Sequence, residues 1–265
     1  MGIANYKSRK FPTPEILQGA YSDGYSSVLI IGTGESTSKL LKHKDKIREH
    51  FDVVIGVNHA TKDFEDIMDF HIIMEKNPVK MAEDMSPNNY RKDLPRILNY
   101  KALDHFPDDM IKFKARREQF FGRPDITKYT HLGVYGLLEY NKPGRKRKLF
   151  YGTVITQAIH FACILGLKNI YLIGADLMFK GDFDHYYKDK FYRNSTSPAR
   201  SQSPIIEVKK DGKMITTLHV FKKSAKYIDK TITRDCRPKG IKVHDFSDGL
   251  IKAAVSLDVD EFFAK

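Results

Sequence analysis

Short apolar runs that alternate with helical segments constrain this sequence more than any other feature. Residues 28–31 (VLII), 52–57 (DVVIGV) and 69–74 (DFHIIM) have the composition of buried strands. Residues 37–51 have the apolar spacing of a helix, and Ser36 or Thr37 can cap its start. Strands that alternate with helices predict an α/β fold: a Rossmann-like parallel sheet with helices on both faces.

The same alternation returns in the second half of the chain. A strongly apolar helix (TVITQAIHFACILG) is expected over 153–166, with Gly166 as its stop. The elements expected after it are a buried strand over 168–174, a helix over about 220–232, a last strand over 241–246 and a terminal helix from Leu250.

The remaining segments set the expected domain plan. Residues 1–25 are polar and broken by proline and glycine, which predicts an extended arm before a single domain over 26–265. Residues 180–212 are polar, rich in tyrosine and without apolar periodicity, so no regular structure is expected there. We interpret 180–219 as a lid inserted in the domain. The charged stretch 79–150 holds only short apolar pieces, such as 95–100 and 110–113.

Composition narrows the class of protein and of partner. The chain has 265 residues, 41% of them apolar, and neither a membrane-length apolar run nor the apolar core of a secretory signal. With only two cysteines, it is expected to be cytoplasmic. Its net charge of +12 leaves three partner classes open: nucleic acid, an anionic substrate, or loose association with an anionic membrane surface. The basic residues are scattered apart from 142–148, which disfavours nucleic acid; a homo-oligomer stays open.

Polar and small residues follow the predicted strands where each strand ends. In open α/β sheets, ligands bind beyond these carboxyl ends. Glycines, amides, hydroxyls and a carboxylate there suit a nucleotide. Glu35 is the exception, because its charge would repel a phosphate. The turn after the first strand has neither the third glycine of the dinucleotide fingerprint nor the Gly-Lys-Ser/Thr of a P-loop. The residues expected at this edge are Gly32, Thr33, Gly34, Ser36, Asn58, His59, Glu75, Asn77, Pro78, Asp176, Ser247 and Asp248.

These pieces resemble two related groups of proteins. One is the family-42 glycosyltransferases, bacterial sialyltransferases that use CMP-sialic acid. The other comprises the archaeal-type 6-hydroxymethylpterin diphosphokinases and flagellin-glycosylation proteins. The matching segments are 28–36, 52–58, 75–78 and 153–179, about a quarter of the chain, and 153–179 is the most specific.

Resemblance to the sialyltransferases implies a GT-A-like transferase with CMP-sugar as donor substrate, a glycan or glycolipid acceptor and no required cofactor or metal. Gly32, Thr33, Gly34 and Ser36 resemble the nucleotide loop, although Thr33 and Glu35 depart from its usual Gly-Asn-Gly-Pro-Ser. Thr153 resembles the first residue of a Thr-Ser-Gly turn, with Val154 and Ile155 in place of the other two. The roles implied are nucleotide contact for Asp176, catalysis for His219 as general base with Asn58 and Asn77, and donor-phosphate binding by the lid residues Tyr186, Tyr187, Lys188, Tyr192 and Arg193.

Two alternatives remain open on the sequence. The second group shares the Asp-Leu-x-Phe pattern at 176–179, followed by His185, and implies Mg²⁺-dependent diphosphoryl transfer. The metal ligands would then be Asp176, Asp182, Asp184 and His185. A non-enzymatic nucleic-acid-binding module would instead use aromatic residues interleaved with basic ones, as in KDKFYR at 188–193.

Overall fold

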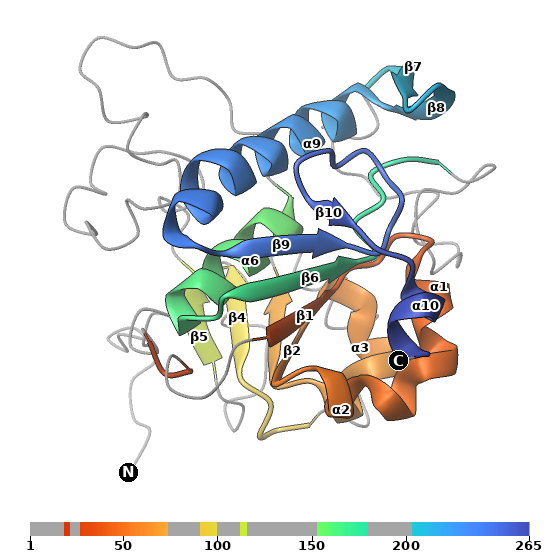
Figure 1. Ribbon diagram of the computed structural model, residues 1–265. Helices are drawn as coiled ribbons and strands as arrows, with labels where there is room; N and C mark the ends of the chain where they lie inside the picture. Colours follow the sequence, from red (N-terminus) through yellow and green to blue (C-terminus); the bar gives the residue numbers. More distant parts are fainter. Residues whose placement is uncertain are drawn as a thin grey trace, which may run out of the picture.

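The computed structural model describes residues 19–21, 27–73, 91–99, 112–115, 153–179 and 203–264 (Figure 1). The strands are β1 Ser27–Ile31, β2 Val53–Val57, β3 Phe70–Ile73, β4 Arg96–Asn99, β5 Lys112–Ala115, β6 Asn169–Ile173, β7 Ile205–Lys210, β8 Lys213–Leu218, β9 Lys242–Asp245 and β10 Val255–Ser256. The longer helices are α6 Val154–Leu165 and α9 His219–Thr231. Shorter helical segments are α1 Thr37–Leu40, η3 Leu41–Lys46, α2 Ile47–His50, η4 Asn58–Ala60, α3 Thr61–Phe64, η5 Glu65–Ile67, η9 Ile232–Cys236, η10 Arg237–Lys239 and α10 Val259–Phe263.

One parallel sheet organises the fold. Its strand order is β10-β9-β6-β1-β2-β3-β4-β5, and every pair in it runs parallel. The chain builds outward from β1 through β2 to β5, then returns to the other side of β1 with β6, β9 and β10. The central strand therefore pairs on both edges, with Val28 opposite Val53 on β2 and Ile170 on β6. This doubly wound arrangement confirms the predicted Rossmann-like α/β fold.

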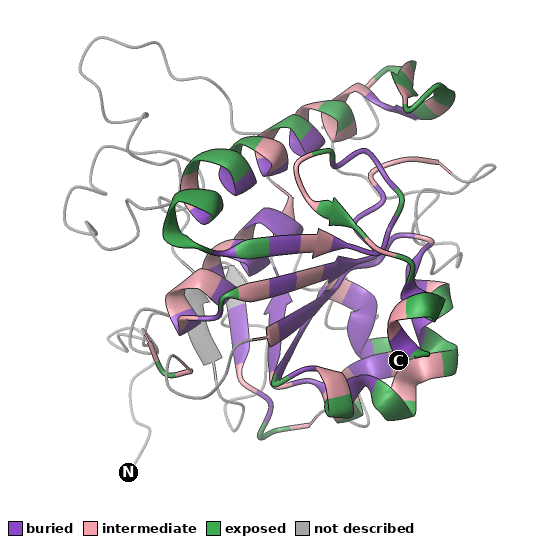
Figure 2. Ribbon diagram, in the orientation of Figure 1, coloured by how far each residue is buried: buried purple, intermediate pink, exposed green. Residues whose placement is uncertain are grey.

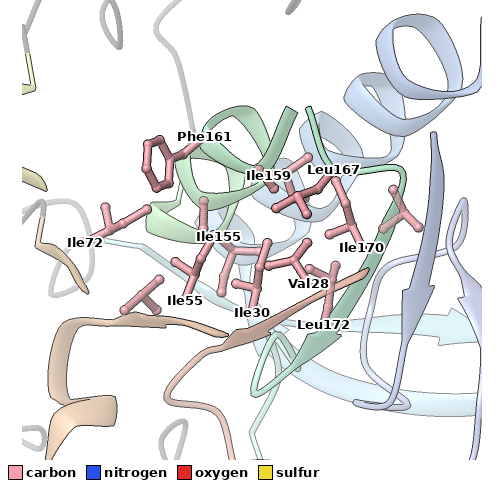
Figure 3. Close-up of a cluster of buried hydrophobic side chains, with 14 of the residues drawn as sticks. Val28, Ile30, Ile55, Ile72, Ile155, Ile159, Phe161, Leu167, Ile170 and Leu172 are labelled. Atoms are coloured by element: carbon pink, nitrogen blue, oxygen red, sulfur yellow. The ribbon is translucent and has the colours of Figure 1, made fainter. Parts of the chain in front are cut away.

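Helices cover both faces of this sheet, as predicted. Because side chains alternate along a strand, Val28 and Ile30 face one layer and Leu29 and Ile31 face the other. The first layer contains α6 and α9, and Figure 3 shows its apolar side chains, among them Ile155 and Ile159 of α6, above β1 and β6. The second layer contains α1, α2, α3 and α10. β2 is buried throughout, and β1 is buried at every residue after Ser27 (Figure 2).

The segment expected as one helix over 37–51 is divided in three. The α-helical turns α1 and α2 contribute the buried Leu40 and Ile47, and the 3₁₀ helix η3 lies between them. No residue of η3 is buried, so tertiary packing does not favour the α-helical form there. Ser36 occupies the N-cap position, but its side chain caps no helical N–H group.

Part of the expected irregular segment 180–212 is a strand. β7 pairs with β8 as an antiparallel hairpin, with Val208 opposite Ile215. Its two-residue turn is Asp211-Gly212, and both residues have positive φ (49° and 82°). An Asp-Gly pair between alternating apolar residues is a strong hairpin signal, and it was overlooked in the polar context. The lid was predicted over 180–219. Residues 180–202 lie outside the described residues, and the described part of the predicted lid contains this hairpin and the first residue of α9.

The C-terminal helix also begins later than expected. Residues after Leu250 first form β10, and α10 starts at Val259. Asp258 sets that start, because its carboxylate accepts hydrogen bonds from Asp260 N (2.8 Å) and Glu261 N (3.0 Å). The expectation of a helix from Leu250 was therefore wrong by about two turns.

Other elements match their predictions closely. Gly166 ends α6 with a φ of 95°, in the left-handed region where glycine is favoured. The apolar pieces 95–100 and 110–113, for which no element was predicted, correspond to β4 and part of β5. Of the arm predicted over 1–25, only 19–21 are described, and there Gly19 N donates to Ile164 O (2.8 Å) at the end of α6.

Candidate functional site

The sheet has a topological switch point between β1 and β6. The chain leaves β1 toward β2 and leaves β6 toward β9, so the loops that follow β1 and β6 diverge at the carboxyl edge. In doubly wound sheets this is the position of the ligand crevice. The two loops comprise residues 32–36 and 174–177, and both were predicted to belong to the site.

These two loops are in direct backbone contact. Gly34 N donates to Gly174 O at 2.9 Å, and Gly32 N donates to Ile173 O at 2.7 Å. A Cβ atom at Gly32 would lie 2.3 Å from Gly174 O, which is closer than any real Cβ approaches an oxygen. The first glycine is therefore required by the approach of one loop to the other.

Asp176 occupies the hydrogen-bond donors of the glycine turn. Its carboxylate, only 2% exposed, accepts the Ser36 hydroxyl at 2.9 Å and the Ser36 N–H at 3.3 Å. The same hydroxyl accepts Gly174 N at 2.9 Å. A Cβ atom at Gly34 would lie 2.0 Å from Asp176 Oδ2. The turn thus holds an anion supplied by the chain itself, at the place where a phosphate would be expected from the sequence.

A second buried carboxylate, Asp245, lies close to Asp176. It ends β9, is 4% exposed, and accepts hydrogen bonds from Ser247 N (2.9 Å) and from the Ser247 hydroxyl. Burial raises its pKa to about 6; the Ser247 hydrogen bonds and Lys210 oppose that rise, and the charge of Asp176 adds to it. The Lys210 ammonium also donates to Gly249 O, which joins the hairpin to this edge.

Asp245 was missed by the sequence analysis. It was counted as part of the strand 241–246, so Ser247 and Asp248 were expected at the edge instead. Ser247 is buried beside Asp245, whereas Asp248 is exposed and has a φ of 38°. A carboxylate near the end of the predicted strand, where its side chain reaches the carboxyl edge, was the signal that could have identified it.

Asn58 follows β2 in a strained conformation. Its φ of 48° lies in the left-handed region, which asparagine tolerates better than most residues. Its carbonyl accepts Nε2 of His71 (2.7 Å), whose pKa burial and the Arg96 charge lower to about 3, so the ring is neutral. Its side-chain Oδ1 is buried and has no hydrogen-bond partner in the part of the chain that the structure describes.

The N-terminal turn of α6 reaches the same edge. α6 packs against β1, β2 and β3 and runs opposite to them, so Thr153 at its N-cap lies at the carboxyl edge. Ile155 of this turn would lie 3.1 Å from a Cβ atom at Gly32. Thr153 Oγ1, Thr156 Oγ1 and Gln157 Oε1 are all buried, and among the described residues none has a partner.

The polar residues of α6 share one side of an otherwise apolar helix. Thr153, Thr156, Gln157 and His160 are spaced i, i+3, i+4 and i+7, whereas Ile155 and Ile159 face the sheet. Burial lowers the pKa of the His160 ring to about 3, so it stays neutral. The sequence analysis recognised Thr153 alone, because the apolar composition of α6 concealed the spacing of the others.

His219, the expected general base, is the first residue of α9. Its backbone N donates to Pro204 O at 3.0 Å, and the residue is half-buried. The hairpin that precedes it is fixed to the loop after β6, since Thr217 Oγ1 donates to Leu177 O at 2.6 Å and Phe179 N to Thr216 O at 3.0 Å. These contacts bring the start of α9 to the edge that carries Asp176.

Several predicted residues lie outside the described residues. They are Glu75, Asn77, Pro78, Asp182, Asp184, His185, Tyr186, Tyr187, Lys188, Tyr192 and Arg193. Of the alternative metal ligands, only Asp176 is described. Within the described ranges no group of three or more His, Cys, Asp or Glu side chains could hold a metal ion. Thr33 is buried in the glycine turn and Glu35 is half-buried, with its carbonyl accepting the Ser38 hydroxyl at 2.8 Å.

Comparisons with known proteins give a likeness at the level of structure. None of the family models matches the sequence, and no curated protein matches it. A similar solved structure is the monofunctional alpha-2,3-sialyltransferase Cst-I from Campylobacter jejuni. The likeness has a TM-score of 0.45 and 15% sequence identity, and covers 86% of this chain and 78% of that one. At this identity and TM-score it does not identify the function of the chain. Among the described helices, none is long and apolar enough to cross a membrane.

Proposed function

We propose that this protein is a nucleotide-sugar-dependent glycosyltransferase that binds its donor at the carboxyl edge of the sheet. The observation that carries the proposal is the set of unpartnered oxygens that follow β2 and begin α6 at the carboxyl edge: Asn58 Oδ1, Thr153 Oγ1 and Thr156 Oγ1. A buried polar group without a partner costs about 1–3 kcal/mol. A ligand rich in hydroxyl and amino groups would supply the missing hydrogen bonds, and a nucleotide sugar is such a ligand.

The buried carboxylates suit hydroxyl groups better than phosphate. Asp176 and Asp245 place two carboxyl groups beneath the glycine turn, and carboxylates repel a phosphate but accept hydrogen bonds from hydroxyl groups. We therefore propose that the turn contacts a ribose or sugar hydroxyl. The candidates for binding the donor phosphate are Lys188 and Arg193, with Tyr186, Tyr187 and Tyr192.

The proposed reaction is transfer from a CMP-activated sugar, as the resemblance to the sialyltransferases implies. His219 accepts the proton of the acceptor hydroxyl. The acceptor oxygen bonds to the anomeric carbon as the bond from that carbon to the phosphate oxygen breaks, and CMP leaves. Asn58 and Asn77 orient the donor. The reaction as written uses the side chains alone and requires no cofactor.

The test is a thermal-shift series with CMP, CDP, GDP, UDP, GTP and ATP, each with and without Mg²⁺. A ligand at about 100 times its dissociation constant adds about 2.7 kcal/mol of stability. We expect CMP to raise Tm by several degrees without metal. A shift seen only with GTP or ATP plus Mg²⁺ would contradict the proposal and support diphosphoryl transfer, and no shift with any nucleotide would support a binding module.

The variant Thr156→Val tests whether the unpartnered oxygens bind the nucleotide. Thr156 is 3% exposed and its hydroxyl is unpartnered, so removing the hydroxyl should stabilise the ligand-free protein by about 1 kcal/mol. The same change should weaken CMP binding about tenfold. Thr233→Ala is the matched control, because that exposed hydroxyl bonds the helix backbone far from the edge. Equal CMP affinity in Thr156→Val and wild type would refute the assignment of these oxygens.

Catalysis is tested separately with His219→Asn. This variant should bind CMP as wild type does but lose at least about 100-fold in transfer rate. A loss of binding instead would indicate a structural role for His219.

A further inference from the structure

The outer surface of α9 and the two helical turns after it is strongly basic. Residues 219–239 contain seven Lys or Arg against two Asp, a net charge of +5. Ser224, Ala225 and Ile228 pack inward, so the exposed positions form one stripe along the helix. Figure 2 shows this outward side exposed along the length of α9. We call it the basic face: Lys222, Lys226, Lys230, Arg234 and Arg237.

Three lysines of the basic face are not paired with carboxylates. Within the described ranges, Lys222, Lys226 and Lys230 take part in no ion pair. The acidic Asp229 is turned toward the 252–253 backbone, where its carboxylate accepts Lys252 N and Ala253 N, both at 2.8 Å. The basic face therefore attracts anions over a length of about 20 Å.

The β7–β8 hairpin extends this surface with apolar side chains. It leads directly into α9 and lies beyond the first turn of that helix (Figure 1). Ile205 is 67% exposed and Met214 is 60% exposed. Lys209 lies opposite Met214 on the same side of the hairpin, because directly paired residues share a face. Met214 lies next to the turn of the hairpin and Ile205 at its open end, opposite Leu218, so exposed apolar side chains and lysines share this face along the length of the hairpin.

We propose that the basic face and the exposed face of the β7–β8 hairpin together dock on an anionic lipid bilayer. Lysine and arginine side chains bind the headgroups electrostatically, while exposed apolar side chains enter the region between headgroups and acyl chains. A nucleic acid would also attract the basic face, but it would not require Ile205 and Met214 to be exposed. The exposed apolar side chains of the hairpin therefore favour the membrane, and the proposal does not depend on the reaction that the site catalyses.

The expected strength follows from the number of cations. Each lysine near an anionic surface contributes about a fivefold factor in binding, so removing three should lower it about 100-fold. Screening by salt should weaken the interaction strongly, since the Debye length falls as ionic strength rises.

The experiment is co-sedimentation of the full chain with vesicles of phosphatidylglycerol and phosphatidylcholine, and with vesicles of phosphatidylcholine alone. The test variant is Lys222→Glu/Lys226→Glu/Lys230→Glu. The control is Lys39→Glu/Lys62→Glu/Lys168→Glu, which makes the same change in net charge at exposed lysines on other surfaces. Circular dichroism verifies that each variant is folded.

We expect the wild type and the control to bind the anionic vesicles and the test variant to lose about 100-fold. Ile205→Ser/Met214→Ser should bind the anionic vesicles more weakly than wild type, and it should lose the part of the binding that persists in wild type at high salt. Equal losses in the test and control variants would overturn the proposal, because net charge alone would then explain binding. Equal binding to neutral vesicles would overturn it as well. So would binding of a single-stranded oligonucleotide, but of no vesicle, that depends on the same three lysines.

Discussion

The contact between Ser36 and Asp176 should be a major determinant of stability at the switch point. Ser36→Ala removes a hydrogen bond to a buried carboxylate, worth about 1.5–3 kcal/mol. It also leaves Gly174 N–H without the hydroxyl that accepts it at 2.9 Å, which adds a penalty of about 1–3 kcal/mol. We expect the free energy of unfolding to fall by about 3 kcal/mol.

A double-mutant cycle isolates the pair. In Asp176→Asn the shape is kept and the charge is lost, so Ser36→Ala should cost about 2 kcal/mol less in that background. Urea unfolding followed by circular dichroism gives the four free energies. Ser38→Ala is the control, because its hydroxyl bonds Glu35 O and does not contact Asp176, so its effect should add to that of Asp176→Asn. A coupling below about 0.5 kcal/mol between Ser36 and Asp176 would refute the reasoning.

Two further predictions concern the same region. Gly34→Ala and Gly56→Ala would each place a Cβ atom 2.0 Å from a neighbour, but the neighbour is the fixed Asp176 carboxylate in the first and the flexible end of Met68 in the second. We expect urea unfolding to show a loss of about 3 kcal/mol for Gly34→Ala and about 1 kcal/mol for Gly56→Ala, and equal losses would contradict the rigidity of the turn. Burial raises the pKa of Asp245 from 3.8 to about 6, so the folded state binds this proton more tightly than the unfolded state does. The contribution of this carboxyl group to the free energy of unfolding therefore falls as pH rises from 3.8 to 6. Relative to wild type, the free energy of unfolding of Asp245→Asn should therefore rise by about 3 kcal/mol across that pH window, as measured by unfolding curves of both proteins at each pH. If the free energy of unfolding changed equally with pH in the two proteins, the carboxyl group would not be buried as described.

The central strands were predictable because a strand that is buried on both faces consists almost entirely of apolar residues. β2, residues 28–31 of β1 and residues 170–173 of β6 are continuous apolar runs, since a strand with helices on each side has no polar face. The stop at Gly166 was equally clear, because glycine readily adopts the left-handed conformation that ends a helix. By contrast, the division of 37–51 depends on which turns are packed against the sheet, and spacing along the sequence does not reveal that.

The interior of the site was less predictable. The sequence placed Ser36 and Asp176 at one edge, but they are 140 residues apart, and no local pattern states that one binds the other. Asp245 was not predicted as a site residue because its raised pKa results from burial and from the nearby Asp176, and neither can be recognised in the sequence. The hairpin was not predicted because its strands are half-exposed and charged, so apolar and polar residues alternate only weakly along them. The Asp211-Gly212 turn was the one clear signal of this hairpin in the sequence.

The position of β1 at the centre of the sheet has a consequence for synthesis of the chain. β1 can pair with β2 soon after both are synthesised. Its other edge stays unpaired until β6 has been synthesised, because the pairing of β1 with β6 begins at Ser27 and Asn169. At about 5–20 residues per second, a ribosome needs about 7–30 s to make the intervening chain. During that interval a wholly apolar strand has an open edge, which is the kind of surface that aggregates. Yield of the folded protein should therefore depend on what protects this edge, such as chaperones or a slower rate of initiation, more than on the final stability of the fold.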